Sequence, residues 1–156
     1  AAAAGLPVAA IATERHMPQT ASVGLPFTLA EVADLTALGR VKADLAAFDT
    51  HFAGRAGDAL YLYVRTGERT VQARMLAPLH GVIEDPATGS AAAALTGFLA
   101  HLAADREGSL PLTIAQGLEM GRPSQIRGAA DKSGGAVTAV RIGGPSVAVA
   151  EGFLTV

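Results

Sequence analysis

The sequence predicts an α+β fold in which a curled, mostly antiparallel and barrel-like sheet wraps around one central alanine-rich helix. Two observations lead to this prediction. Many short segments with strand-like apolar residues are separated by turns, which 18 glycines and 8 prolines supply. One segment, from about Gly89 to Ala104, has instead a run of small residues with high helix propensity. Short strands around a small-residue helix are typical of α+β proteins.

The composition of the 156-residue chain indicates a single folded domain. Half of the residues are apolar and 17% are charged, which excludes disorder. A formal net charge of −2 without a basic patch argues against nucleic acid or an anionic membrane as a partner. Since the chain has no cysteine, we expect no disulfide or thiolate chemistry, and a cytoplasmic location.

The first third of the chain is expected to hold two strand regions and a helix. Strands are predicted over Leu6–Thr13 and over Gln19–Val32, the second broken at Gly24 and Pro26. A helix is predicted over Val41–Ala53, because large apolar residues recur there at helical spacing. These residues are Val41, Leu45, Phe48 and Phe52.

The rest of the chain reads as a hairpin, the alanine-rich helix and four further strands. Asp58–Arg65 alternates as a strand does, and Gly67–Glu68 turns it into Thr70–Ala77. After the helix, Gly108 is expected to act as a stop signal. The later strands are predicted over Leu110–Gly117, Ser124–Ala130, Gly135–Gly144 and Ser146–Val156.

The alanines allow the helix to be enclosed by a sheet at close range, because they add almost no side-chain bulk. Leu95, Phe98, Leu99 and Leu102 are expected to anchor its later turns. His101 lies among them and is expected to be an ordinary surface histidine.

The segment "DPATGS" at the start of this helix allows two interpretations. Pro86 biases Asp85 toward an extended conformation, and Thr88 or Ser90 can cap the helix. In the first interpretation, this is an ordinary helix cap, and the negative charges of Glu84 and Asp85 stabilise the N-terminus of the helix. The same free N–H groups, with the helix dipole and close approach at Gly89, also make a site for a substrate carboxylate or phosphate.

The second candidate segment is "AQGLEMGRPSQI". It reads either as a glycine-rich connection with an exposed arginine or as a loop that closes over a ligand. In the second case Gln116 is a hydrogen-bonding group and Arg122 an anion partner or a brace. The four histidines lack metal-ligand spacing, and no phosphate-binding or dinucleotide motif is present. We therefore predict neither a metal nor a cofactor.

The segment "RMLAPLHGVIEDPATGSAAAALTGFL" resembles the signature of the PhzF-like (phenazine biosynthesis-like) family, within the diaminopimelate-epimerase-like fold. The resemblance continues in "ASVGLPFTLAEV", "QGLEMGRPSQI" and "VRIGGPSVAVAEGFLTV" and covers nearly the whole chain. Proteins like this have two similar domains, each a curved sheet around a central helix. Ligands bind between them, at the N-termini of both helices.

The resemblance implies an isomerase or epimerase that moves protons without a cofactor, on a small carboxylate-bearing metabolite. By that resemblance Asp85 is a polar or acid–base participant at the domain interface, and we expect it to be the catalytic residue of this half. Gly89 and Ser90 would hold the substrate carboxylate, and Thr88 would support the turn. Gln116, from the second candidate segment, is the remaining expected substrate-binding residue. Diaminopimelate epimerases proper use one cysteine in each half, so this chain cannot follow their two-thiol mechanism.

The resemblance is to the C-terminal half of the family only, because the GNPA-like segment and the catalytic glutamate of the first half have no counterpart here. We expect residues 1–20 to be a residual inter-domain or first-strand segment. Residues 21–148 are then the domain, and 149–156 a terminal strand that returns toward the missing one. A homo-oligomer, a dimer in the simplest case, or a complementing chain would complete the site. The alternative is a non-catalytic carboxylate-binding module or assembly partner.

Overall fold

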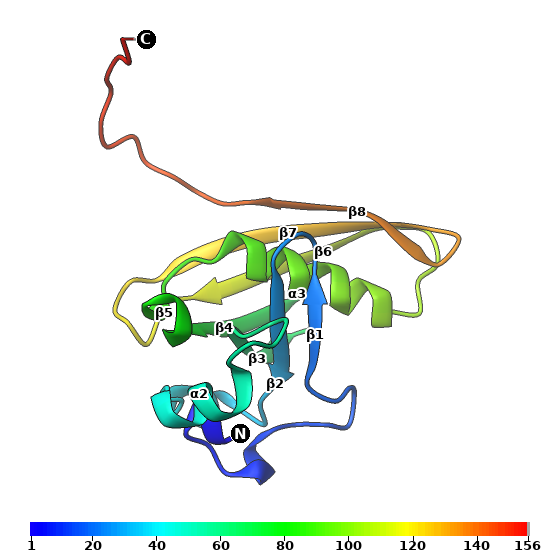
Figure 1. Cartoon of the computed structure of the whole chain (residues 1–156). Coiled ribbons are helices and arrows are strands. Elements are labelled where there is room, and N and C mark those ends of the chain that lie inside the picture. Colours follow the sequence, from blue (N-terminus) through cyan, green and yellow to red (C-terminus); the bar gives the residue numbers. More distant parts are fainter. Residues whose placement is uncertain (156) are drawn as a thin grey trace.

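The computed structural model describes residues 1–155, which form an eight-stranded sheet around helix α3 (Figure 1). The strands are β1 (Gln19–Ser22), β2 (Pro26–Glu31), β3 (Leu60–Gly67), β4 (Thr70–Ala77), β5 (Val82–Asp85), β6 (Gly108–Gln116), β7 (Ser124–Ser133) and β8 (Ala136–Gly143). The α-helices are α1 (Leu35–Gly39), α2 (Leu45–Phe52) and α3 (Gly89–Leu102). Short 3₁₀ turns span Ala2–Ala4, Val8–Ala10 and Pro78–His80.

The strand order confirms the predicted fold class. The strands follow the order β1-β2-β3-β4-β6-β7-β8, and β5 pairs with β4. Only the β2–β3 and β4–β6 pairs, among the described residues, are parallel. One edge of β4 pairs first with β6, where Ala73 lies opposite Gln116, and then with β5, where Met75 lies opposite Asp85. This shared edge brings the ends of β5 and β6 together.

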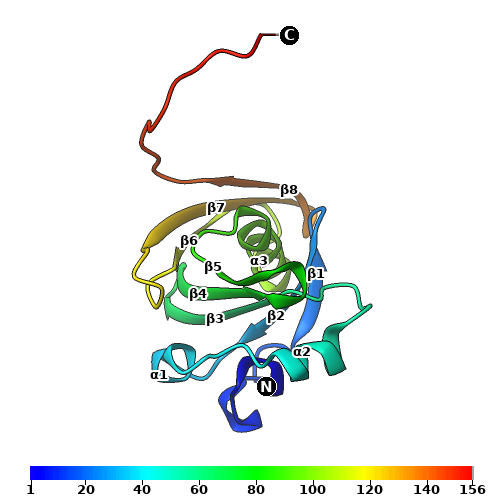
Figure 2. The ribbon, with the colours of Figure 1, turned by 60° about the vertical axis from the view of Figure 1, so that its left-hand side comes forward.

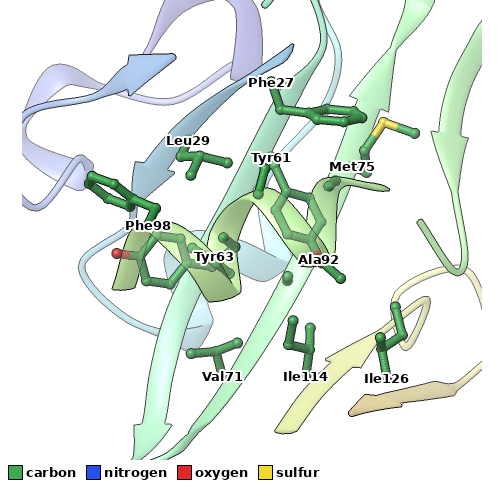
Figure 3. Close-up of a cluster of buried hydrophobic side chains, with 14 of the residues drawn as sticks. Phe27, Leu29, Tyr61, Tyr63, Val71, Met75, Ala92, Phe98, Ile114 and Ile126 are labelled. Atoms are coloured by element: carbon green, nitrogen blue, oxygen red, sulfur yellow. The ribbon is translucent and has the colours of Figure 1, made fainter. Parts of the chain in front are cut away.

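The sheet curls around α3, as the view close to the helix axis shows (Figure 2). Ala91, Ala92 and Ala94 are almost completely buried, so small side chains face the surrounding strands on several sides of the helix. Large side chains fill the remaining space, with Tyr61 and Tyr63 lying in the same cluster as Phe98 (Figure 3). The alanines therefore permit the close enclosure that the sequence predicted.

Helix and sheet approach each other closely between α3 and β7. A Cβ atom on Gly128 would overlap the side chain of Thr96, whose hydroxyl donates to the carbonyl oxygen of Ala92 at 2.7 Å. At the other end of this contact, Lys132 Nζ donates to the carbonyl oxygens of Ala100 and Ala103, each at 2.8 Å. A lysine there satisfies carbonyls that the end of the helix leaves free and complements its dipole.

Two predicted strands are wrong. Leu6–Thr13 forms a 3₁₀ turn at Val8–Ala10 and a single bridge from Ile11 to Val32. Leu6, Ala10 and Ile11 pack in a second cluster with residues of α1, α2 and the outer face of the sheet, which needs no strand pairing, whereas Val8 is exposed. Ser146–Val156 forms no strand within the described residues, because residues 144–155 have no regular structure, and Val156 lies outside the described part of the chain.

The helix boundaries differ from the predicted ones for local reasons. The helix expected over Val41–Ala53 begins only at Leu45, because the Asp44 carboxylate accepts from Ala47 N–H and caps it there. Helix α3 ends at Leu102, well before Gly108, which instead begins β6. The sequence prediction also missed α1, which the Asp34 carboxylate caps in the same way, and β5.

We predict that replacing Gly128 with alanine lowers the free energy of unfolding by about 2 kcal/mol, because a methyl group there overpacks the contact with Thr96. The measurement is urea denaturation. Gly143→Ala is the matched control, since Gly143 also lies in an outer strand but a Cβ atom there would meet no other atom within 4 Å. The double variant G128A/T96A should recover most of the loss. An unchanged midpoint for G128A would contradict the close packing.

Candidate functional site

Strand β5 separates the two neighbouring acids of the opening motif. Successive side chains of a strand point to opposite faces, so Glu84 and Asp85 point in opposite directions. Glu84 forms a bidentate ion pair with Arg74 of β4, in which Arg74 Nε and Nη2 each donate to a carboxylate oxygen at 2.7 Å. Arg74 Nη1 also donates to the carbonyl oxygens of Leu38 and Val41.

This ion pair makes Glu84 a structural residue. Both side chains are largely buried, with 8% of Arg74 and 14% of Glu84 exposed. Hydrogen bonding to Glu84 raises the pKa of Arg74 above its ordinary value, so the guanidinium keeps its charge. The pair fastens β5 to β4, and it thereby fixes where Asp85 begins the turn into α3.

Asp85 turns toward the start of α3. Thr88 Oγ1 donates to Asp85 Oδ2 at 2.5 Å. Behind this contact lies Gln116, the last residue of β6, whose side chain is fully buried. Gln116 Nε2 donates to the carbonyl oxygen of Asp85 at 2.7 Å and to Thr88 Oγ1 at 3.0 Å. The turn between β5 and α3 is thus held from the inside by an amide side chain.

Tyr61 of β3 completes this cluster, and the sequence prediction missed it. Its hydroxyl donates to Gln116 Oε1 at 2.9 Å. Burial, and secondarily the nearby carboxylate of Asp85, raise the pKa of Tyr61 far above its ordinary value, so the hydroxyl keeps its proton. The only sequence signal was a tyrosine at an inward position of an alternating strand, which is also what a core residue would give.

The first turn of α3 is open to solvent. Thr88 occupies the N-cap position, but its side chain makes no capping hydrogen bond, because its hydroxyl is directed to Asp85. Gly89 and Ser90 are exposed, and their N–H groups have no acceptor within the helix. The expected side-chain cap by Thr88 is therefore absent. An uncapped helix start of this kind attracts an anion.

A shallow pocket of about 360 Å³ adjoins this helix start. Small residues and backbone form most of its wall, including Gly89, Pro123, Ser124, Gln125, Ile142 and Gly143. It lies between the first turn of α3 and the neighbouring ends of β7 and β8. Gly89 is thus the residue of the helix start that lines the pocket, whereas Ser90 is not among its lining residues.

The loop after β6 packs directly behind the turn. Gly117 has a φ of +78°, and a Cβ atom there would overlap the carbonyl oxygens of Arg122 and Pro86. Only glycine fits this conformation and this contact. Arg122 is exposed, and its backbone N–H donates to the carbonyl oxygen of Gly117 at 2.9 Å. The loop is thus held by close contacts between backbone atoms.

The structure brings all five predicted site residues together, four of them along the turn and the fifth directly beneath it. Asp85, Thr88, Gly89 and Ser90 lie along one turn at the molecular surface or just below it. Gln116 lies behind them with no exposed surface. In residues 1–155, neither a group of three metal-ligating side chains nor a helix long and apolar enough to cross a membrane is found.

A curled sheet around a small-residue helix is the architecture of the PhzF-like fold. A crystal structure of a Bacillus anthracis phenazine biosynthesis protein of the PhzF family has this fold, with a TM-score of 0.73 and 18% identity over 91% of this chain and 53% of that one. The family model described as phenazine biosynthesis-like protein (PhzC-PhzF) matches residues 2–152. The chain belongs to this family.

Curated relatives agree with this assignment. An uncharacterised isomerase of Mesorhizobium japonicum is 41% identical over 98% of this chain and 53% of its own length. A trans-2,3-dihydro-3-hydroxyanthranilate isomerase of Pseudomonas aeruginosa is 44% identical over 52% of this chain and 29% of its own length. The chain spans about half the length of the first of these relatives.

We predict that Glu84→Gln lowers the free energy of unfolding by about 3 kcal/mol, because it leaves the buried Arg74 guanidinium without its counter-charge. Thermal or urea unfolding measures this change. Glu68→Gln is the control, since Glu68 is 89% exposed and its contact with Arg69 is long. Replacing both partners, as R74M/E84L, should cost less than E84Q alone. Equal stability of E84Q and wild type would show that the pair does not hold β5.

Proposed function

We propose that this chain is one half of a cofactor-independent isomerase or epimerase that moves a proton on a small carboxylate-bearing metabolite. Asp85 is the acid–base group of this half. The N–H groups of Gly89 and Ser90 bind the substrate carboxylate, and Thr88 and Gln116 complete the site. The reaction class is that of the relatives named as isomerases.

The observation that carries this proposal is the uncapped start of α3 beside a carboxylate. Thr88 leaves the helix N–H groups open because its hydroxyl bonds Asp85. An anionic group of a substrate bound there would lie within one turn of the Asp85 side chain. A general base needs this proximity to the proton that it removes.

The second half of the site comes from another domain or chain. The chain spans about half of the Mesorhizobium relative. The tail beyond β8 exposes large apolar side chains, including Val149 (89%) and Phe153 (98%), as surfaces that bind another protein do. We propose that these residues return toward the complementing half, and that the complete enzyme is a cytoplasmic dimer or a larger homo-oligomer.

The test combines this chain with the part of the Mesorhizobium isomerase that it does not match. The mixture is separated by size, and the complex is incubated in D₂O with trans-2,3-dihydro-3-hydroxyanthranilate, the compound in the name of the Pseudomonas relative. We expect a stable complex that incorporates deuterium into the compound. A complex that forms but incorporates none would contradict the catalytic proposal and favour the alternative, a carboxylate-binding module.

We predict that Asp85→Asn abolishes deuterium incorporation in this complex, because the amide cannot accept the proton. Folding should be nearly intact, since Asn keeps an oxygen that can accept from Thr88 Oγ1. Asp131→Asn, which removes a carboxylate from an outer strand, is the matched control and should keep the activity. Full incorporation by D85N would rule out an acid–base role for Asp85.

A further inference from the structure

The hydrogen bonds around Asp85 allow only one assignment of donors and acceptors. The carbonyl oxygen of Asp85 can only accept, so the atom of Gln116 that lies 2.7 Å from it is the nitrogen Nε2. The backbone N–H of Thr88 can only donate, so the atom that it meets at 3.3 Å is the oxygen Oε1. The orientation of the Gln116 amide is therefore fixed by one neighbour that can only accept and one that can only donate.

The orientation of the Gln116 amide also determines where the hydroxyl hydrogens of Tyr61 and Thr88 point. Because Oε1 accepts, the hydroxyl of Tyr61 must donate to it. Because Nε2 donates to Thr88 Oγ1, the single hydroxyl hydrogen of Thr88 points away from Gln116, toward Asp85 Oδ2. Each link supplies one hydrogen, and none is left over or missing.

The chain of hydrogen bonds ends on one oxygen of the carboxylate. Asp85 Oδ2 already accepts the hydroxyl hydrogen of Thr88, so a proton on this oxygen would clash with that hydrogen. Asp85 Oδ1 is not part of this contact, and among residues 1–155 the only buried side-chain polar atom without a partner is Arg65 Nε. Oδ1 is therefore the carboxylate oxygen that the contact with Thr88 leaves free.

We propose that Tyr61, Gln116 and Thr88 form a directed hydrogen-bond chain that holds Asp85 Oδ2 as an acceptor and leaves Oδ1 to exchange the proton with the substrate. This inference rests on the proposed function and adds Tyr61 as a positioning residue. Tyr61 touches neither the pocket nor the open helix start, because it is fully buried. It acts through Gln116 and Thr88.

The hydrogen-bond chain has two consequences for the chemistry. Donation to Oδ2 keeps this oxygen occupied as an acceptor, so Oδ1 is the oxygen left to remove a proton. It also prevents rotation of the carboxylate, so one defined oxygen faces the substrate and the reacting atoms stay aligned. Each donor in the line polarises the next, so the buried tyrosine contributes although it is remote from the carboxylate.

The test compares three isosteric replacements. Thr88→Val removes the donor to Asp85, Tyr61→Phe removes the first donor of the chain, and Thr88→Ser keeps the hydroxyl. Tyr63→Phe is the matched control, because Tyr63 points inward from the same strand. Its hydroxyl lies 2.6 Å from His16 Nε2, outside the hydrogen-bond chain that leads to Asp85. T88V does not remove a helix cap, because Thr88 makes none.

In the complemented enzyme we expect kcat to fall at least 10-fold in T88V and about 3-fold in Y61F, with KM within 2-fold of wild type. T88S should recover most of the kcat that T88V loses, because it keeps the hydroxyl, and Y63F should match wild type. The proposal is overturned if Y61F matches Y63F, or if kcat and KM change together.

A second readout needs no activity. In this chain alone, the hydroxyl proton at position 88 is followed by NMR. A proton held between Thr88 Oγ1 and Asp85 Oδ2 should exchange slowly with water, and its exchange should be faster in Y61F but not in Y63F. Such a result with no deuterium incorporation would support the hydrogen-bond chain while the proposed function failed. Equal exchange of this proton in Y61F and Y63F would remove the chain, whatever the activity.

Discussion

The close enclosure of α3 by the curled sheet is the constraint on which the rest of the structure depends. Alanines at 91, 92 and 94 and the absence of a side chain at Gly128 let the strands approach the helix from several sides. The helix then has no freedom to slide, because Lys132 holds its last carbonyls. Its first turn consequently lies at a fixed point, beside the ends of β5 and β6.

Next to this helix start, the neighbouring acids Glu84 and Asp85 have different roles. The alternation of β5 directs Glu84 into a buried pair with Arg74 and directs Asp85 to the helix start. Thr88 likewise has two effects, because its hydroxyl orders the Asp85 carboxylate and, by not capping the helix, leaves the N–H groups of Gly89 and Ser90 open. We propose that one turn thus provides both an anion site and an oriented acid.

The sequence indicated the fold and most of this turn, because both leave strong local signals. The alanine run predicted the buried helix, and "DPATGS" predicted its start with Asp85 and Ser90. Features that depend on tertiary contacts were not visible. Leu6 and Ala10 of the segment Leu6–Thr13 are buried from a 3₁₀ turn and coil, which a strand pattern cannot reveal. Tyr61 reads as a core residue until its hydroxyl is seen beside Gln116.

The central claim is that the start of α3 is an open carboxylate site. It is tested most directly by titrating this chain with acetate and benzoate while recording the amide signals of Gly89 and Ser90 by NMR. We predict saturable shifts of these two amides, with chloride at equal ionic strength giving none. Shifts spread evenly over the surface, or confined to residues away from the first turn of α3, would contradict the account.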